Sequence, residues 1–176
     1  KISGLTVWLK ADAGLYQDAA GTTPAVADAD PVGLWQDQSG NGYHAAQSTA
    51  GSRPALKLNI QNGKPVVRFD ATDDRMIGTI AGVLGNTSKT IIVAAAYTSG
   101  APGSWVGIGA NSDLLKIFGL GVASNTNLVL AQFGAGNDLA DGVTDTHFHI
   151  YGGKKDGNFL SMYKDGALIT GPTEFV

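Results

Sequence analysis

Short apolar runs separated by turn signals make up the pattern of this chain. Residues 5–10 alternate, with Leu5, Val7 and Leu9 on one face, as expected of a half-buried strand. Residues 90–97 are apolar without interruption, which is typical of a central strand covered on both faces. Further strands are predicted at 64–69, 105–108, 117–122, 128–133, 148–152 and 159–163. Helical periodicity is weak throughout, so the pattern predicts an all-β fold.

Between these runs lie dipeptides that favour tight hairpin turns. Their first residue tolerates a positive φ and their glycine adopts one freely, as a type I′ turn requires. The four dipeptides are Asn41-Gly42, Asn62-Gly63, Asp156-Gly157 and Asp165-Gly166. Residues 16–33 are small, polar and contain proline, which predicts a long surface loop.

Composition limits the number of domains and the classes of partner that we expect. The 176 residues suit one domain, and 43% of them are hydrophobic, enough for a substantial core. The net charge of −3 leaves no basic stripe for phosphates, so a nucleic-acid partner is not expected. No apolar run approaches the ~20 residues of a membrane span, so membrane insertion is not expected. There is no cysteine, which removes disulfides and thiolate chemistry. Because the chain begins at Lys1, we expect processing or a longer parent polypeptide.

Carboxylate content argues against catalysis on glycans. Glycoside hydrolases use a pair of carboxylates that flank the bond. The chain has a single glutamate, Glu174, and no predicted strand carries alternating aspartates that would face a groove. A glycan-acting enzyme is therefore the least favoured hypothesis, and the chain is predicted to be non-catalytic.

Four segments together resemble a known family. They are the runs GLTVWLKAD at 4–12, WQDQSGNG at 35–42 and GKPVVRFD at 63–70, and a late hairpin that ends in Tyr163-Lys164-Asp165-Gly166. In order and spacing the chain resembles the laminin-G-like, concanavalin-A-like jelly-roll modules of bacterial secreted proteins and phage particle proteins. The resemblance implies an antiparallel two-sheet β-sandwich that forms a single domain over 1–176.

Relatives of this type continue past the Asp-Gly hairpin with more strands, whereas this chain stops at Val176. We therefore expect the last strands of the domain to be missing. We also expect residues 5–10, or a neighbouring strand, to be completed by a strand from outside residues 1–176. An oligomer or a longer chain would supply it.

The resemblance implies a non-catalytic recognition or structural module. A place on a viral particle or an extracellular surface is expected, as a decoration, tail, spike or adhesin component. Its partners would be other protein subunits of an assembly or a surface glycan. The alternative is a carbohydrate-binding, lectin-like module, with calcium as a candidate cofactor. Fold alone does not decide between these hypotheses.

Calcium is the metal that the polar residues favour. Asp37, Ser39 and Asn41 alternate in a glycine-rich loop, and Asp73 and Asp74 follow a predicted strand. Calcium prefers several carboxylate, amide and carbonyl oxygens, so Asp37, Asn41, Asp73 and Asp74 are the candidate ligands. The competing interpretation, which the residue types favour, is that Asp37 and Asn41 form Asx-turns.

Two histidines raise a weaker metal alternative. His147 and His149 share one face of a predicted strand, a spacing that can bind zinc. Only His44 remains as a third imidazole, so polar residues facing water at a strand edge are the favoured interpretation.

Aromatic residues are the candidates for ligand binding, because the apolar faces of sugars stack on exposed rings. Trp105 follows a loop and is expected to be the most exposed. Trp8 and Trp35 occupy motif positions and are expected to pack in the core. The candidate ligand-binding residues are Tyr16, Tyr43, Tyr97 and Trp105.

Overall fold

The computed structural model describes residues 2–82, 87–97, 103–109, 118–123, 127–132, 139–141 and 146–174. In this part of the chain the regular structure is β-strand, apart from one 3₁₀ turn, and every strand pair is antiparallel. The all-β prediction is therefore confirmed. Among these residues no helix has the length and hydrophobicity needed to cross a bilayer.

The chain divides into two compact units, Lys1–Ile80 and Ala81–Val176. We call them the N-terminal unit and the C-terminal unit and describe each by itself. Each unit is compact by itself. The expectation that 1–176 is a single domain stays a prediction.

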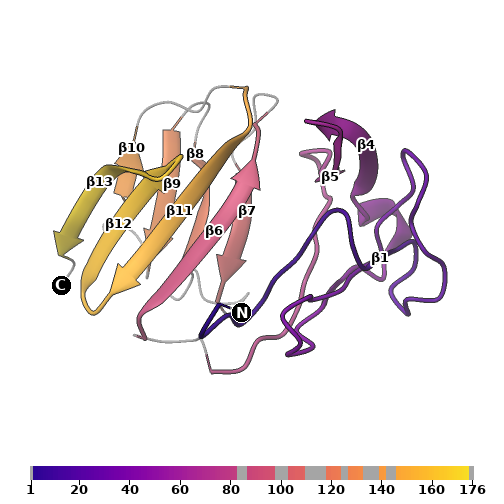
Figure 1. Cartoon of the computed structure of the whole chain (residues 1–176), viewed down its shortest axis with the longest axis horizontal. Helices are drawn as coiled ribbons and strands as arrows, with labels where there is room; N and C mark the ends of the chain where they lie inside the picture. The colour runs from indigo at the N-terminus through magenta and orange to yellow at the C-terminus, as the bar shows by residue number, and fades with distance from the viewer. Residues whose placement is uncertain are drawn as a thin grey trace. The chain divides into compact units, whose positions relative to one another are not determined.

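The N-terminal unit contains very short strands and one hairpin (Figure 1). Three two-residue strands form one sheet in the order β1-β2-β3, and β4 and β5 form a two-stranded sheet. The elements are β1 (Leu15–Tyr16), β2 (Leu34–Trp35), β3 (Ala45–Ala46), η1 (Ala50–Ser52), β4 (Ala55–Gln61) and β5 (Lys64–Arg68). Asn62 and Gly63 join β4 to β5 with φ of 51° and 73°, as the predicted type I′ turn requires.

A small apolar cluster holds this unit together. Leu15, Ala25, Val32 and Leu56 are buried, and Trp35 packs against them with other side chains. The expected core position of Trp35 is confirmed. Residues 16–33 were predicted to be a surface loop, and this is only partly correct, because Ala25 and Val32 face the core.

The C-terminal unit contains two four-stranded antiparallel sheets with long strands (Figure 1). One sheet has the order β13-β12-β11-β6, and the other has the order β10-β9-β8-β7. The first consists of β6 (Lys89–Ala95), β11 (His149–Asp156), β12 (Phe159–Lys164) and β13 (Ala167–Glu174). The second consists of β7 (Gly103–Ile108), β8 (Phe118–Ala123), β9 (Asn127–Gln132) and β10 (Leu139–Asp141).

Both sheets contribute to one core. Tyr151 and Met162 of the first sheet and Phe118 and Leu120 of the second are each at most 1% exposed and belong to the same cluster. Along β6 and β11, the side chains that alternate with these core positions are exposed. Each of the two strands therefore has one face toward the core and one face toward solvent. The arrangement is sandwich-like.

Two strand predictions are wrong. Residues 5–10 lie in no strand and make only isolated bridges, Leu9 to Asp37 and Lys10 to Ala13. The expectation that an outside strand completes residues 5–10 therefore loses its basis. Residues 90–97 were predicted to be covered on both faces. Instead β6 is the last strand of its sheet, and Ile92 is 72% exposed.

The late hairpin has the expected turn. Asp165 and Gly166 join β12 to β13 with φ of 51° and 82°. The Asp156-Gly157 prediction is one residue out of register, because Asp156 ends β11 and Gly157-Asn158 form the turn. Asn41-Gly42 lies in the loop 36–44, which joins the antiparallel strands β2 and β3, and forms no tight two-residue turn.

Candidate functional site

The loop around Asp37 is the most densely hydrogen-bonded part of the N-terminal unit. Oδ1 of Asp37 accepts the amides of Trp8 and Ser39, each at 2.8 Å. Oδ2 accepts the Ser39 hydroxyl at 2.7 Å and the Tyr43 amide at 3.1 Å. The Asp37 amide in turn donates to Nδ1 of His44 at 3.0 Å. This carboxylate therefore ties the loop to the N-terminal segment.

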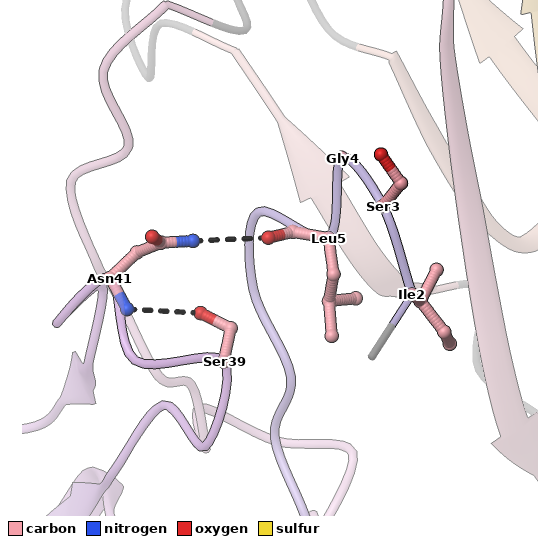
Figure 2. Close-up of a pocket in the computed structure, with 6 residues that line it drawn as sticks. All are labelled: Ile2, Ser3, Gly4, Leu5, Ser39 and Asn41. Atoms are coloured by element: carbon pink, nitrogen blue, oxygen red, sulfur yellow. Dashed lines mark hydrogen bonds between the residues drawn. The ribbon is translucent and has the colours of Figure 1, made fainter.

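Asn41 makes a second connection to the same segment. Its side-chain amide donates to the carbonyls of Leu5 at 3.0 Å and Thr6 at 2.9 Å. Figure 2 shows the Leu5 bond. It also shows a bond that the backbone N–H of Asn41 donates to the Ser39 hydroxyl oxygen at 3.2 Å. These bonds hold residues 2–5 beside the loop and form a cavity of about 440 Å³. Its lining residues are apolar or uncharged, with no ionisable side chain among them: Ile2, Ser3, Gly4, Leu5, Ser39 and Asn41.

The electrostatics agree with a structural role for Asp37. Burial by itself raises the pKa of this carboxyl. The hydrogen bonds from the backbone amides of Trp8, Ser39 and Tyr43 outweigh burial and lower the pKa to about 2. Asp37 is therefore ionised at neutral pH, and four donors engage its oxygens. The Asx-turn interpretation accounts for Asp37, whose Oδ1 accepts the Ser39 amide, whereas the Asn41 side chain donates to the carbonyls of Leu5 and Thr6 instead.

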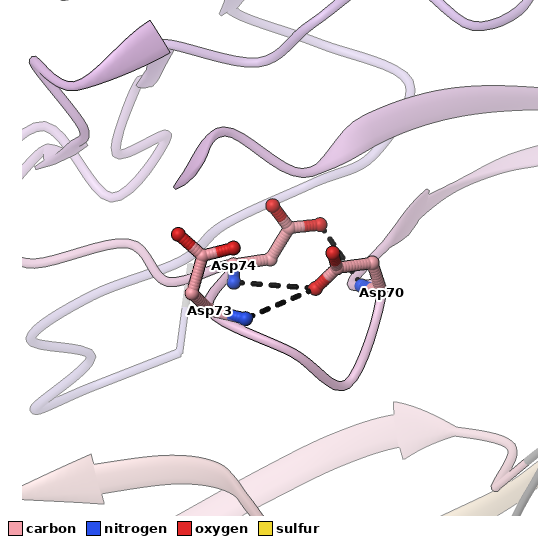
Figure 3. A group of neighbouring side chains, drawn as sticks. All are labelled: Asp70, Asp73 and Asp74. Carbon is pink, nitrogen blue, oxygen red and sulfur yellow. Dashed lines mark hydrogen bonds between the residues drawn. The ribbon is translucent and has the colours of Figure 1, made fainter. Parts of the chain in front are cut away.

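A different group of carboxylates gathers just after β5. One oxygen each of Asp70, Asp73 and Asp74 lies within 4.8 Å of the others, close enough to hold a metal ion. Figure 3 shows how the turn brings them together. Oδ1 of Asp70 accepts the amides of Thr72, Asp73 and Asp74 at 2.8, 3.3 and 3.3 Å. Oδ2 of Asp74 accepts the Asp70 amide at 2.9 Å.

The pKa shifts in this cluster have opposite signs. Hydrogen bonding, first of all from the Thr72 amide, lowers the pKa of Asp70. Burial raises the pKa of Asp74, and the nearby charges of Asp70 and Asp73 raise it further. Asp73 is exposed and accepts the Ser52 hydroxyl at 2.6 Å. A cation at this point would relieve the repulsion that raises the Asp74 pKa.

The predicted metal ligands are thus divided. Asp73 and Asp74 belong to the carboxylate cluster, whereas Asp37 does not, and Asn41 is bonded to the N-terminal segment. Sequence reasoning missed Asp70 as the third carboxylate. The spacing Asp70-x-x-Asp73-Asp74 was the available signal, since a tight turn brings such residues together.

Of the four aromatic candidates, Tyr16 lines a cavity in the described structure. This cavity, of about 400 Å³, lies in the N-terminal unit, and Asp12, Pro24, Leu56 and Pro65 are among its lining residues. Tyr16 is half-buried at the end of β1. This cavity, which we call the Tyr16 groove, is thus lined by an aromatic ring, a carboxylate and two prolines.

Tyr43 is not among the residues that line this cavity. Tyr43 is half-buried, and its amide supports Asp37. Tyr97 is half-buried and follows β6 in the C-terminal unit. Trp105 lies in β7, and its side chain falls outside the described part of the chain. Trp8, expected in the core, is 49% exposed, with the Lys10 ammonium 5.3 Å from its ring centre.

The histidine pair lies in the C-terminal unit. Nδ1 of His149 is 2.5 Å from Oδ2 of Asp165, and its ring meets Tyr151 edge-on at 5.8 Å. Oδ1 of Asp165 accepts the Ile150 amide at 2.9 Å. His149 thus braces the β12–β13 turn. His147 is exposed and precedes β11. The carboxylate cluster described above contains neither residue.

Comparison with known proteins adds no relative. No family model matches the chain, and searches of curated proteins and of solved structures found no match. The resemblance to laminin-G-like modules therefore rests on the sequence motifs and stays a prediction.

Proposed function

We propose that this chain is a non-catalytic recognition or structural module of laminin-G-like, concanavalin-A-like jelly-roll type. It acts on a viral particle or an extracellular surface, with protein subunits of an assembly as its partners. The observation that carries the proposal is the C-terminal unit, where two four-stranded antiparallel sheets share one core. Of the four segments that carry the resemblance, the late hairpin belongs to this unit, where Asp165 and Gly166 form the turn between β12 and β13.

The way aspartates are used supports a non-catalytic role. Asp18 accepts the amides of Ala20, Thr22 and Thr23, and Asp30 accepts those of Val26 and Ala27. Asp37 and Asp70 serve their own loops in the same manner. A carboxylate committed to backbone amides is stabilised as the anion, which makes it a poor general acid.

Location tests this proposal directly. An antibody against the chain should detect it in particles or at the surface of the source cells, by fractionation and immunogold microscopy. A cytosolic protein and a secreted protein of the same source serve as markers. Detection in the cytosol alone would contradict the proposal, and so would turnover of a glycan substrate by the purified chain.

A second candidate function is calcium-assisted glycan binding, which two features of the N-terminal unit favour. Asp70, Asp73 and Asp74 supply the carboxylate oxygens that calcium prefers. The Tyr16 groove supplies a ring on which the apolar face of a sugar can stack. Both features lie in the same compact unit.

Calcium titration with thermal unfolding tests the metal arm. If the ion binds the folded state alone, millimolar calcium raises Tm, because affinities of extracellular modules lie near ~10⁻⁴–10⁻³ M. Asp73→Asn should abolish the rise and keep the bond to Ser52. Asp12→Asn is the matched control, because Asp12 forms an exposed ion pair with Lys10. This variant should still show the rise in Tm with calcium. An unchanged wild-type Tm across the titration refutes calcium binding.

A glycan array with and without calcium tests the sugar arm. Binding should weaken in Tyr16→Ala, provided that circular dichroism shows the variant folded. Binding that survives both chelation and this substitution would place the ligand elsewhere. An array without signal removes the second candidate function and leaves the structural role.

A further inference from the structure

One edge of the first sheet in the C-terminal unit is unpaired. β6 pairs with β11 on one side, and it is the outermost strand of its sheet (Figure 1). Within the described residues, the backbone of 90–95 makes no hydrogen bond other than those to β11. In an antiparallel strand every second residue directs its N–H and C=O away from the neighbour. Along residues 90–95, β6 therefore has a row of donors and acceptors that no strand of its own sheet satisfies.

The two edges of this sheet differ in how they are protected. At the opposite edge, β13 carries two register shifts against β12, contains Pro172 and ends in the exposed Glu174. Bulges, proline and charge are the devices by which native edges avoid pairing. Between Thr90 and Ala95, β6 has no proline, no charge and no register shift against β11. The edge that lacks these devices is the one suited to strand pairing.

Side chains on the outer face continue the apolar character of this edge. Ile92 is 72% exposed, and Ile150 on the adjacent β11 is 55% exposed. Ile92 stands in a cross-strand row with Gly152, Tyr163 and Leu168, and Leu168 is 50% exposed. Large exposed aliphatic side chains beside an unpaired edge mark a contact surface.

We propose that β6 pairs with β6 of a second copy of this chain, antiparallel and about a two-fold axis. The register is centred on Ile92, so that Ile92 faces its own counterpart. Thr90 then lies opposite Ala94, and Ile91 opposite Val93. These are β-branched or small residues, which pack well as cross-strand partners.

Charge selects this orientation. Lys89, at one end of β6, is the strand's only charged residue. Antiparallel pairing places Lys89 opposite Ala95 and separates the two ammonium groups by the length of the strand. A parallel pair would place them side by side, where like charges repel. The strand is thus complementary to itself in one orientation.

Such a contact closes on itself. A two-fold pairing uses the same surface on both copies. The β6 edge of each copy is then occupied, and the assembly is limited to a dimer. Growth into a filament would need a second bare edge, and β13 is protected. In the second sheet, the edge strand β7 has a register shift against β8, and the other edge strand, β10, has three residues. A dimer is the expected assembly.

This inference deepens the proposed structural role by naming a partner and a surface, and it rests on that role for its meaning. Its test is independent of location. Sedimentation of the purified chain, across a concentration range of about a hundred-fold, should report a mass twice the 18.1 kDa of one copy at the upper end. A monomer at every concentration overturns the inference and leaves the surface or particle location untouched.

Two lysine substitutions distinguish the edge from the face. Ile92→Lys opposes two like charges at the two-fold axis and should give a monomer. Ile150→Lys adds the same charge on the same face one strand inward, and should keep the dimer. Circular dichroism checks that both variants fold. A dimer that survives Ile92→Lys, or one that both substitutions break, overturns the assignment to the β6 edge.

Cross-linking fixes the register. The chain has no cysteine, so Ile92→Cys introduces a single thiol. Directly opposed Cβ atoms are about 4.5–5.5 Å apart, near enough for a disulfide after a small adjustment. Under mild oxidation this variant should form a covalent dimer, whereas Ile150→Cys should not. Equal cross-linking of both variants contradicts the two-fold pairing.

Discussion

The two units solve the same problem of satisfying buried backbone groups in different ways. In the C-terminal unit, strands β11 and β13 of eight residues each bond to their neighbours along a ladder. In the N-terminal unit, strands β1 to β3 have two residues each. Ladders that short bond few amides, so loop carbonyls and aspartate side chains accept many of the others. One unit therefore depends on repetition, and the other on individual carboxylates.

This difference implies different weaknesses. A ladder over an apolar core loses stability when core volume is removed. A fold held by carboxylates loses stability when a single acceptor is removed or protonated. Four substitutions or conditions, taken from the largest expected effect to the smallest, test this contrast.

Leu120→Ala should give the largest effect. Leu120 is 1% exposed in β8 and packs in the core shared by the two sheets of the C-terminal unit. Truncation of such a residue costs about 2–5 kcal/mol of unfolding free energy, because it leaves a cavity. Denaturant unfolding measures the loss, and hydrogen exchange should place it in residues 149–164. Leu168→Ala, half-exposed, is the control and should cost under about 1 kcal/mol. Equal losses would mean that this core does not carry the unit.

Asp37→Ala should be the most damaging polar substitution in the N-terminal unit. It removes the acceptor of the Trp8, Ser39 and Tyr43 amides, and we expect a loss of about 3 kcal/mol. Hydrogen exchange of residues 4–9 and 37–44 should rise. Asp12→Ala, whose side chain is 42% exposed, is the control and should change little. A stable Asp37→Ala variant would show that the loop is held by other contacts.

Gly33→Ala tests how tightly the backbone of the N-terminal unit packs. A Cβ at this position would lie 2.6 Å from the carbonyl carbon of Asp18 and 2.7 Å from the Gln17 oxygen. Because both neighbours are main chain, we expect a cost of about 1–3 kcal/mol. Gly51→Ala meets nothing within 4 Å and should be neutral in the same unfolding assay. A neutral Gly33→Ala would show that the backbone there can yield.

The sequence predicted the strands of the C-terminal unit better than those of the N-terminal unit. Local signals sufficed where alternation or an apolar run coincided with a hairpin turn, as at β11, β12 and the Asp165-Gly166 turn. Residues 5–10 alternate equally well, yet they meet no partner strand and bond in large part to side chains of the loop at 37–41. β13 was missed, because Gly171 and Pro172 interrupt its pattern. Pairing with a distant segment, which decides these cases, leaves no local pattern.

The same limit applies to the candidate sites. The glycine-rich loop at 37–42 was recognised, and the competing Asx-turn interpretation accounts for Asp37 within it. Whether Asp37 would join Asp73 and Asp74 depended on tertiary contacts that spacing does not report. The edge position of β6 was equally hidden, because an apolar run looks the same in a central strand and in a strand that awaits a partner.

Acid should weaken the N-terminal unit first, with the smallest effect of the four. The pKa of Asp37 is lowered to about 2 from 3.8, so its contribution is complete above pH 4 and lost as pH falls toward 2. By pH 3 this residue alone should cost about 1 kcal/mol of unfolding free energy. The lowered pKa values of Asp18 and Asp70 act in the same direction. The raised pKa of Asp74 opposes them.

In the C-terminal unit two lysine pKa shifts lie at the other end of the pH scale. Burial lowers the pKa of Lys89 and of Lys155. The free-energy cost of burying their charged forms therefore falls as pH rises toward 10.5. The lowered pKa values of Asp156 and Asp165 belong to exposed groups, whose pairs weigh little. Hydrogen exchange at pH 3 against pH 6, corrected for intrinsic rates, should therefore show residues 4–44 opening before 149–164. Simultaneous opening would mean that the ladder also depends on ionised carboxylates, and the contrast between the units would fail.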